Sequence, residues 1–227
     1  MAEIINEFAD ICPYTDEQAR AAFAKLAESP LALNMSKVLF PEKDADFLKN
    51  VLSQIETVDQ FQKVVIAQCI DWVIKNSVKE FTFDGIENMK KINGRYLSVS
   101  NHRDIVVDPA ITQLVMHLNG LETSQLCVGD NLLMNPYVDL VLRSNKMIKV
   151  IRGVGARELY QNSMTLSKYI RKTITSGESS VWIAQREGRA KNGVDVTEQG
   201  ILKMFDMSGS GDFVKDFQEL NILPLSI

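Results

Sequence analysis

The stretch that decides the fold class is YLSVSNHRDIVVDP, residues 96–109. Its first residues predict a short strand that ends at Ser100. Asp108 and Pro109 predict the start of a helix, because aspartate can accept free N–H groups and proline suits the first helical position. The loop between them carries His102, one of two histidines in the chain. A strand, a polar loop and a helix in this order are typical of an α/β protein.

The same alternation of short apolar runs and helical patterns continues from about residue 81 to the end of the chain. The runs are apolar on both faces, which favours a mainly parallel sheet flanked by helices. Ligands of such sheets gather at the carboxyl ends of the strands, where His102 falls. Strands are predicted at 96–100, 125–128, 149–151, 180–184 and 222–227, and helices at 109–118, 156–176 and 198–207.

The N-terminal part of the chain predicts helices only. Thr15 is a candidate N-cap followed by acidic residues, and further helices are expected over 44–55 and 57–79. We therefore expect an N-terminal helical region over 1–80 and an α/β domain over 81–227. Because the chain stops inside a predicted strand, we expect this domain to be truncated at its C-terminus. The last helix carries one apolar stripe, at Val58, Phe61, Val65, Cys69, Trp72 and Val73.

Composition narrows the class of protein. The hydrophobic content of 45% is enough for a core, and no apolar run is long enough to span a bilayer. Cys12, Cys69 and Cys127 are scattered and odd in number, which favours reduced thiols in a cytosolic protein over a disulfide framework or a zinc site.

Charge is distributed unevenly along the chain. The net charge is −4, yet residues 142–191 hold 11 Lys and Arg against 3 Asp and Glu. An acidic protein with one basic segment is expected to bind an anion at one place, such as a phosphate group or an anionic lipid. Nucleic acid fits less well, because the segment has few aromatic residues and no recognition motif.

Two loops combine the residue types that chemistry requires. In the loop after residue 100, either Asp104 or Asp108 can fold back onto His102, orient the ring and leave its other nitrogen as a base. The loop after residue 184 reads QREGRAK, in which Gly188 allows close backbone approach and the cations can hold a phosphate. These cations are Arg186, Arg189 and Lys191.

Four blocks, taken in order over residues 95–227, resemble the glycerolipid acyltransferase family, which acylates glycerol 3-phosphate or lysophosphatidate. The blocks are Asn101–Asp104 with the following acids, Lys149–Arg152, Gln185–Arg189 and Leu223–Leu225. The chain departs from the family in two places. Val107 stands where the family has an aspartate, with Asp108 one residue later, and the arginine of the third block is shifted.

The resemblance implies a glycerophosphate acyltransferase-like fold and a specific use of these residues. His102 would take the proton from an acceptor hydroxyl, with Asp108 or Asp104 orienting the ring. Fatty acyl would come from acyl-CoA or acyl carrier protein and pass to a glycerol phosphate or lysophosphatidate acceptor; no metal or other cofactor is expected. The substrate-binding residues that it implies are Asn101, Arg103, Arg152, Arg186, Glu187, Gly188, Arg189 and Lys191.

The residues leave two other functions open: a non-catalytic lipid-binding module of the same fold, or an ester or thioester hydrolase. An acyltransferase of phospholipid biosynthesis would work in the cytoplasm, peripherally associated with the inner face of the membrane. Anionic lipid could then be attracted by surface cations. Candidates for this are Arg143, Lys146, Lys168, Arg171 and Lys172.

Overall fold

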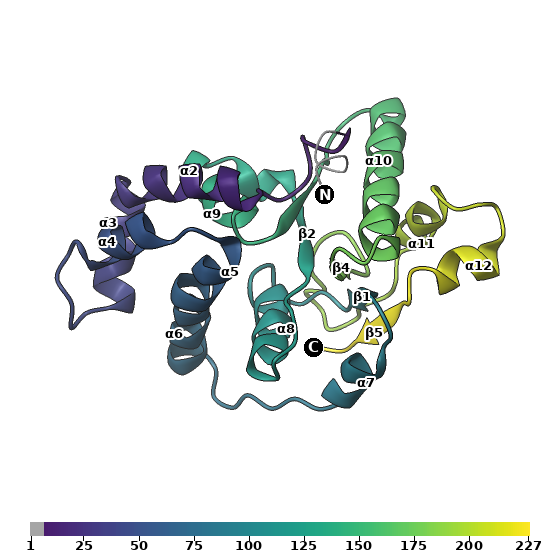
Figure 1. The fold of residues 1–227 in the computed structure, drawn as a ribbon. Coiled ribbons are helices and arrows are strands. Elements are labelled where there is room, and N and C mark those ends of the chain that lie inside the picture. The colour runs from purple at the N-terminus through teal and green to yellow at the C-terminus, as the bar shows by residue number, and fades with distance from the viewer. Residues whose placement is uncertain (1–6) are drawn as a thin grey trace. The chain divides into compact units, whose positions relative to one another are not determined.

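A computed structural model describes residues 7–227 of the chain (Figure 1). The chain forms two compact units. The first, here the α/β unit, contains residues up to 12 together with 83–129 and 148–227. The second, here the helical unit, contains 13–82 and 130–147, so a segment from the middle of the chain joins the N-terminal helices.

The α/β unit is built on a five-stranded sheet in the order β3-β2-β4-β1-β5. β1 pairs in parallel with both β4 and β5, and β2 pairs in parallel with β4. Ser100, the last residue of β1, lies opposite Ala184 of β4 and Leu225 of β5, so the loops after these three strands leave from the same edge. The strands are β1 Leu97–Ser100, β2 Gln125–Gly129, β3 Met147–Val150, β4 Val181–Ala184 and β5 Leu223–Leu225.

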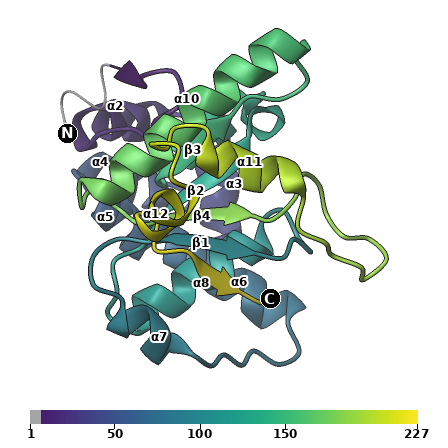
Figure 2. The same cartoon turned by 90° about the vertical axis from the view of Figure 1, so that its right-hand side faces the viewer.

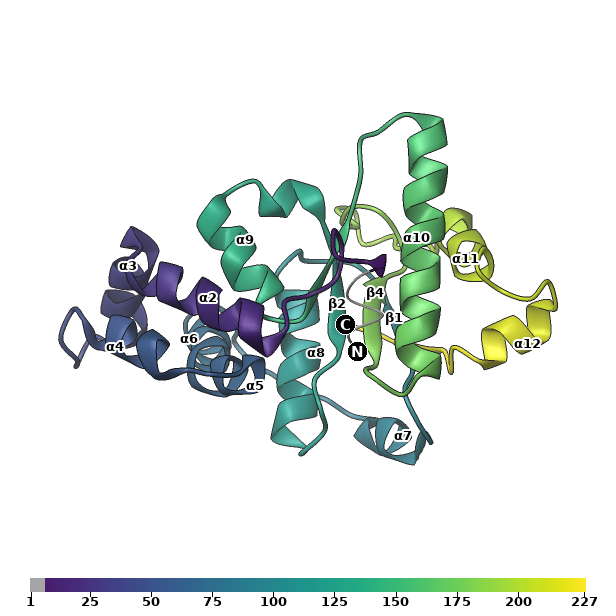
Figure 3. The same ribbon diagram turned by 45° about the horizontal axis from the view of Figure 1, so that its top comes forward.

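Helices cover both faces of this sheet, which confirms the predicted α/β class. Figures 2 and 3 show α8 (Val107–Leu118) on one face, and α10 (Ala156–Thr175) on the other together with α11 (Gln199–Asp206) and α12 (Phe213–Gln218). A further short helix, α7, spans Ile86–Lys91. The α10 side chains that enter the core recur on one face of the helix and pack with strand residues such as Leu97 and Val181. They are Leu166, Tyr169, Ile170 and Ile174.

The helical unit has its own apolar core, which includes Phe23, Leu48 and Phe61. Thr15 caps its first helix as predicted: its side chain accepts the N–H of Gln18, and the Gln18 side chain accepts the N–H of Thr15. The elements are α2 Asp16–Ala27, α3 Pro30–Leu39, α4 Phe47–Gln54, α5 Val58–Phe61, η1 Gln62–Ile66, α6 Ala67–Ser77, η2 Asp130–Leu133 and α9 Pro136–Arg143.

The helix predicted over 57–79 differs from expectation in its middle. η1 is a π-helical turn between α5 and α6, and such a turn inserts one extra residue. The insertion rotates the face that follows, and the predicted stripe continues to Cys69, which packs against the core, but not to Trp72. Phe61 and Val65 are buried, whereas Trp72 is 42% exposed.

The described part of the chain, residues 7–227, holds no helix that is both long enough and apolar enough to cross a membrane.

Candidate active site

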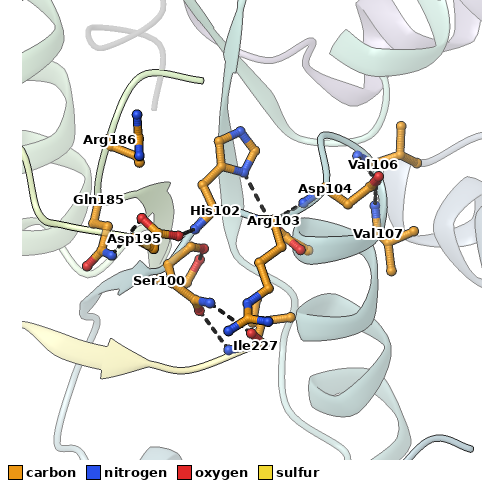
Figure 4. Close-up of polar contacts among 12 residues, drawn as sticks. Ser100, His102, Arg103, Asp104, Val106, Val107, Gln185, Arg186, Asp195 and Ile227 are labelled. Atoms are coloured by element: carbon orange, nitrogen blue, oxygen red, sulfur yellow. Dashed lines mark hydrogen bonds and ion pairs between the residues drawn. The ribbon is translucent and has the colours of Figure 1, made fainter. Parts of the chain in front are cut away.

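His102 lies in the loop that joins β1 to α8 (Figure 4). Its Nδ1 is 3.0 Å from Oδ2 of Asp108. The Asp108 side chain is 2% exposed and that of His102 is 13% exposed. An imidazole that donates its Nδ1–H to a carboxylate keeps its basic lone pair on Nε2. The pair therefore forms a candidate base, whose tautomer a buried carboxylate can set.

The backbone of the loop fixes the Asp108 carboxylate. Oδ2, the atom that faces His102, also accepts the main-chain N–H of Arg103 at 2.6 Å and that of Asp104 at 2.9 Å. These bonds orient the carboxylate toward the ring.

Asp104, the other predicted partner of His102, accepts hydrogen bonds from main-chain N–H groups instead. Its Oδ1 accepts the N–H groups of Val106 and Val107, both at 2.8 Å. The bond from Val107, with that from Val106, lowers the pKa of the Asp104 carboxyl although burial acts to raise it. Asp104 thus caps the main-chain N–H groups at the start of α8.

This corrects the sequence-based prediction that Asp108 caps the helix. α8 begins at Val107, and Asp108 already lies in its first turn, with its side chain turned to the loop. Pro109 is tolerated as the third helical residue, because N–H groups in the first turn have no partner within the helix.

The Asn101 side chain links the end of β1 to the main chain that follows β5. Its side-chain Nδ2 donates to the carbonyl of Ile227 at 2.8 Å, and its Oδ1 accepts the N–H of Ile227 at 2.7 Å. Both polar groups of this predicted substrate-binding side chain are therefore used by the main chain that follows β5. The side chain of Arg103, in contrast, is exposed.

The loop after β4 lies against the His102 loop. Gln185 donates its N–H to the carbonyl of Ser100 at 2.7 Å, and Ala190 donates its N–H to the carbonyl of His102 at 2.8 Å. Gly188 adopts a φ of 71°, which glycine reaches without the steric strain of a side chain. The predicted anion-binding segment is thus brought to the candidate base.

One residue of this site was missed by the sequence analysis. Asp195 accepts the main-chain N–H of His102 with Oδ2, and the Nε2 of Gln185 at 3.0 Å with Oδ1 (Figure 4). Burial acts to raise the pKa of the Asp195 carboxyl, but the bonds from Gln185 and His102 and the nearby Arg186 together lower it. No local pattern distinguishes Asp195 from other acids on loops.

The predicted cations lie at the same edge of the sheet. Arg152 follows β3, and its Nη1 is 3.9 Å from the Glu187 carboxylate. Arg186 is half-buried, and its Nε donates to the carbonyl of Glu187 at 3.5 Å. Arg189 is exposed and close enough to Asp104 to help lower the pKa of that carboxyl. Lys191 is exposed two residues farther along the loop.

The chain matches one protein family by sequence: the model of the family described as "Acyltransferase" matches residues 80–227, more than half of the chain. The chain belongs to this acyltransferase family. The family predicted from the four sequence blocks is therefore confirmed. No curated protein matches the acyltransferase significantly.

Among solved structures, the acyltransferase is similar to the 1-acyl-sn-glycerophosphate (LPA) acyltransferase PlsC from Thermotoga maritima. The two chains are 15% identical, with a TM-score of 0.46. The alignment covers 86% of this chain and 70% of the other.

The arrangement in the acyltransferase joins a candidate base and several cations at one edge of the sheet. A base at His102 can remove a proton from a hydroxyl, and cations beside it can hold an anionic substrate. The residues described, 7–227, contain no cluster of three or more His, Cys, Asp or Glu side chains arranged to hold a metal ion.

Proposed function

We propose that this acyltransferase moves a fatty acyl group from acyl-CoA or acyl carrier protein to a hydroxyl of a glycerol phosphate or lysophosphatidate acceptor, with His102 as general base. The observation that carries the proposal is the 3.0 Å contact between His102 Nδ1 and the buried carboxylate of Asp108. The carboxylate orients the ring and stabilises the imidazolium that forms when Nε2 takes a proton.

The reaction proceeds in two bond exchanges. His102 Nε2 removes the proton of the acceptor hydroxyl as its oxygen attacks the thioester carbonyl carbon, which forms the new C–O bond. The C–S bond then breaks, and the thiolate leaves with the proton that His102 had taken. Transfer is direct, without an acyl-enzyme, which agrees with the absence of a G-x-S-x-G motif from the sequence.

Both substrates are anionic, and the cations near His102 suit them. Arg152 and Arg189 bind the acceptor phosphate, with Arg103, Arg186 and Lys191 adding positive charge around it. Glu187 sets the position of Arg152 through their 3.9 Å contact, and Gly188 allows the loop backbone to approach the phosphate. Asn101 supports the site from the end of β1 through its two bonds to Ile227.

We also propose where the enzyme works in the cell and which part of the chain carries the chemistry. The enzyme serves phospholipid biosynthesis from the cytoplasmic side, and meets lipid-like substrate peripherally at the inner face of the membrane. Residues 81–227 supply the catalytic chemistry, although 130–147 of this range pack in the helical unit with 13–82.

Two other functions fit the same residues: ester or thioester hydrolysis, and lipid binding without turnover by the same fold. The experiment that separates them incubates long-chain acyl-CoA with and without glycerol 3-phosphate or lysophosphatidate. We expect a new acyl ester that requires the acceptor and is abolished by His102→Ala. The matched control is His117→Ala, since His117 is exposed on α8 and belongs to no part of the site.

Free fatty acid released at the same rate without any acceptor would identify a hydrolase. The protein could instead bind lipid but turn over neither acyl-CoA nor acyl carrier protein thioesters. That result would favour the lipid-binding module. Full activity of His102→Ala would contradict the assignment of the base.

A further inference from the structure

Asp195 joins the loops that follow two neighbouring strands. Its Oδ2 accepts the main-chain N–H of His102, two residues beyond the end of β1. Its Oδ1 accepts the Nε2 of Gln185, one residue beyond the end of β4. The two strands are paired, with Ser100 opposite Ala184. One carboxylate therefore bridges the ends of both strands.

The loop that carries Asp195 is closed on itself by further bonds to Gln185. The N–H of Glu198 donates to the Gln185 carbonyl at 2.9 Å, and the hydroxyl of Thr197 donates to Gln185 Oε1 at 2.8 Å. The segment 185–198 is therefore a closed loop, and it contains all three cations predicted to bind the acceptor from this side: Arg186, Arg189 and Lys191.

Both main-chain groups of His102 are bonded to this closed loop. Asp195 accepts the N–H, and Ala190 donates its own N–H to the carbonyl at 2.8 Å. A shift of the loop must therefore shift the His102 backbone. The position of the ring depends on this backbone as well as on Asp108.

Aspartate suits position 195 because both of its side-chain oxygens can accept a hydrogen bond. The two groups that it meets, a main-chain N–H and a side-chain amide, are both donors. An asparagine keeps both contacts only if the Gln185 amide turns over and donates to the Thr197 hydroxyl, and it loses the negative charge that strengthens both bonds.

We propose that Asp195 is a positioning residue. It links the closed loop 185–198 to the backbone of His102, so that the loop cations and the base are held in position together. The proposal rests on the proposed function, which makes His102 the base and the loop cations the phosphate ligands. Removing the Asp195 carboxylate then lowers kcat through His102 and raises the KM of the acceptor through the loop.

The test compares the single variant Asp195→Asn with a double variant that carries both Asp195→Asn and Gln185→Glu, here called the exchange. In the exchange, the asparagine oxygen accepts the His102 N–H and its NH₂ donates to the new carboxylate, which still accepts the Thr197 hydroxyl. We expect Asp195→Asn to lower kcat/KM about 10- to 100-fold, the loss of one charge-assisted bond, and the exchange to recover most of it. Asp206→Asn, an exposed acid at the end of α11, is the control.

A second measurement does not depend on turnover. NMR spectra at one pH follow the imidazole of His102, which the His117→Ala variant assigns because the chain has two histidines. We expect Asp195→Asn to move the His102 ring resonances, the exchange to restore them, and Asp206→Asn to leave them unchanged.

Asp195 has no positioning role if Asp195→Asn keeps wild-type kinetics and His102 resonances. The proposal is also overturned if Asp195→Asn loses activity only in step with its melting temperature and the exchange recovers nothing. A wild-type protein that transfers no acyl group would contradict the proposed function instead, and the His102 resonances would still report whether Asp195 holds that backbone.

Discussion

Asp104 and Asp108, four residues apart, hold different ends of the loop before α8. Asp104 accepts the N–H groups of Val106 and Val107 at the start of the helix. Asp108 faces His102 Nδ1 at 3.0 Å and is almost fully buried. The two carboxylates can therefore be tested separately, one as a helix cap and the other as the partner of the base.

Exchanging each of these aspartates for asparagine should separate their roles. In Asp108→Asn the amide oxygen can still accept the loop N–H groups, but the negative charge beside the imidazolium is lost. We expect kcat to fall by about 10²–10⁴-fold, the range of general-base catalysis, with little change in melting temperature. Asp104→Asn keeps an oxygen for the helix amides and should retain near wild-type kcat. Equal losses of kcat in both variants would contradict this division.

Removing the cations should affect the acceptor more than the thioester. A charge-assisted hydrogen bond contributes about 1.5–3 kcal/mol, so Arg152→Ala or Arg189→Ala should raise the acceptor KM by about 10-fold or more. Lysine should restore little, because it cannot form a bidentate contact. Steady-state kinetics with each substrate varied in turn measure the effect, and Arg20→Ala, exposed in the helical unit, is the control. Equal changes in both KM values would count against phosphate binding.

Stability at low pH should depend on Asp216 in α12. Its buried carboxylate accepts the N–H and hydroxyl of Ser210 and the N–H of Gly211. The bond from the Ser210 N–H, with the others, holds the pKa of Asp216 below its usual value. Because the folded state has the lower pKa, this stabilisation is complete above the ordinary aspartate pKa of about 4 and is lost as pH falls through the folded value.

The measurement is denaturant unfolding at several pH values from 7 to 2. We expect wild type to lose free energy of unfolding below about pH 4. Asp216→Asn should be less stable at pH 7, with a flatter dependence below pH 4. Parallel curves for the two proteins would show that Asp216 does not carry the acid sensitivity.

Binding to membranes should be electrostatic. Each cation near an anionic surface contributes about 1 kcal/mol, and salt screens such attraction beyond about 8–10 Å. We expect cosedimentation with anionic vesicles at low salt, loss of it at high salt and little binding to neutral vesicles. Lys168→Glu, at an exposed position of α10, should weaken binding, whereas Lys25→Glu in α2 should not. Binding that ignores salt and lipid charge would contradict this mechanism.

Arg171, predicted from the sequence to attract lipid, is used inside the α/β unit instead. Its side chain is 11% exposed and donates to the carbonyls of Phe205 and Asp216 and to the Glu219 carboxylate. Arg171→Ala should therefore lower stability without changing the salt dependence of vesicle binding.

The sequence predicted the strands well and several helices not at all. Short apolar runs between polar loops mark buried strands, so all five lie within a few residues of their predicted places. The helices α3, α7, α9 and α12 were missed. α7 and α12 have only six residues each, and packing stabilises such short helices more than their own pattern does. Two start signals, Ser29–Pro30 and Asn135–Pro136, were available in the sequence.

By itself the sequence determined that a histidine follows one strand and a cluster of cations follows another, because these positions depend only on local pattern. Tertiary structure alone decided that Asp108 rather than Asp104 faces the ring, since the helix start and the loop turn have to be formed together. It also decided the contact of Asp195 with His102, 93 residues away in sequence. That contact exists because β4 pairs with β1, and strand order is set by non-local packing that no local pattern encodes.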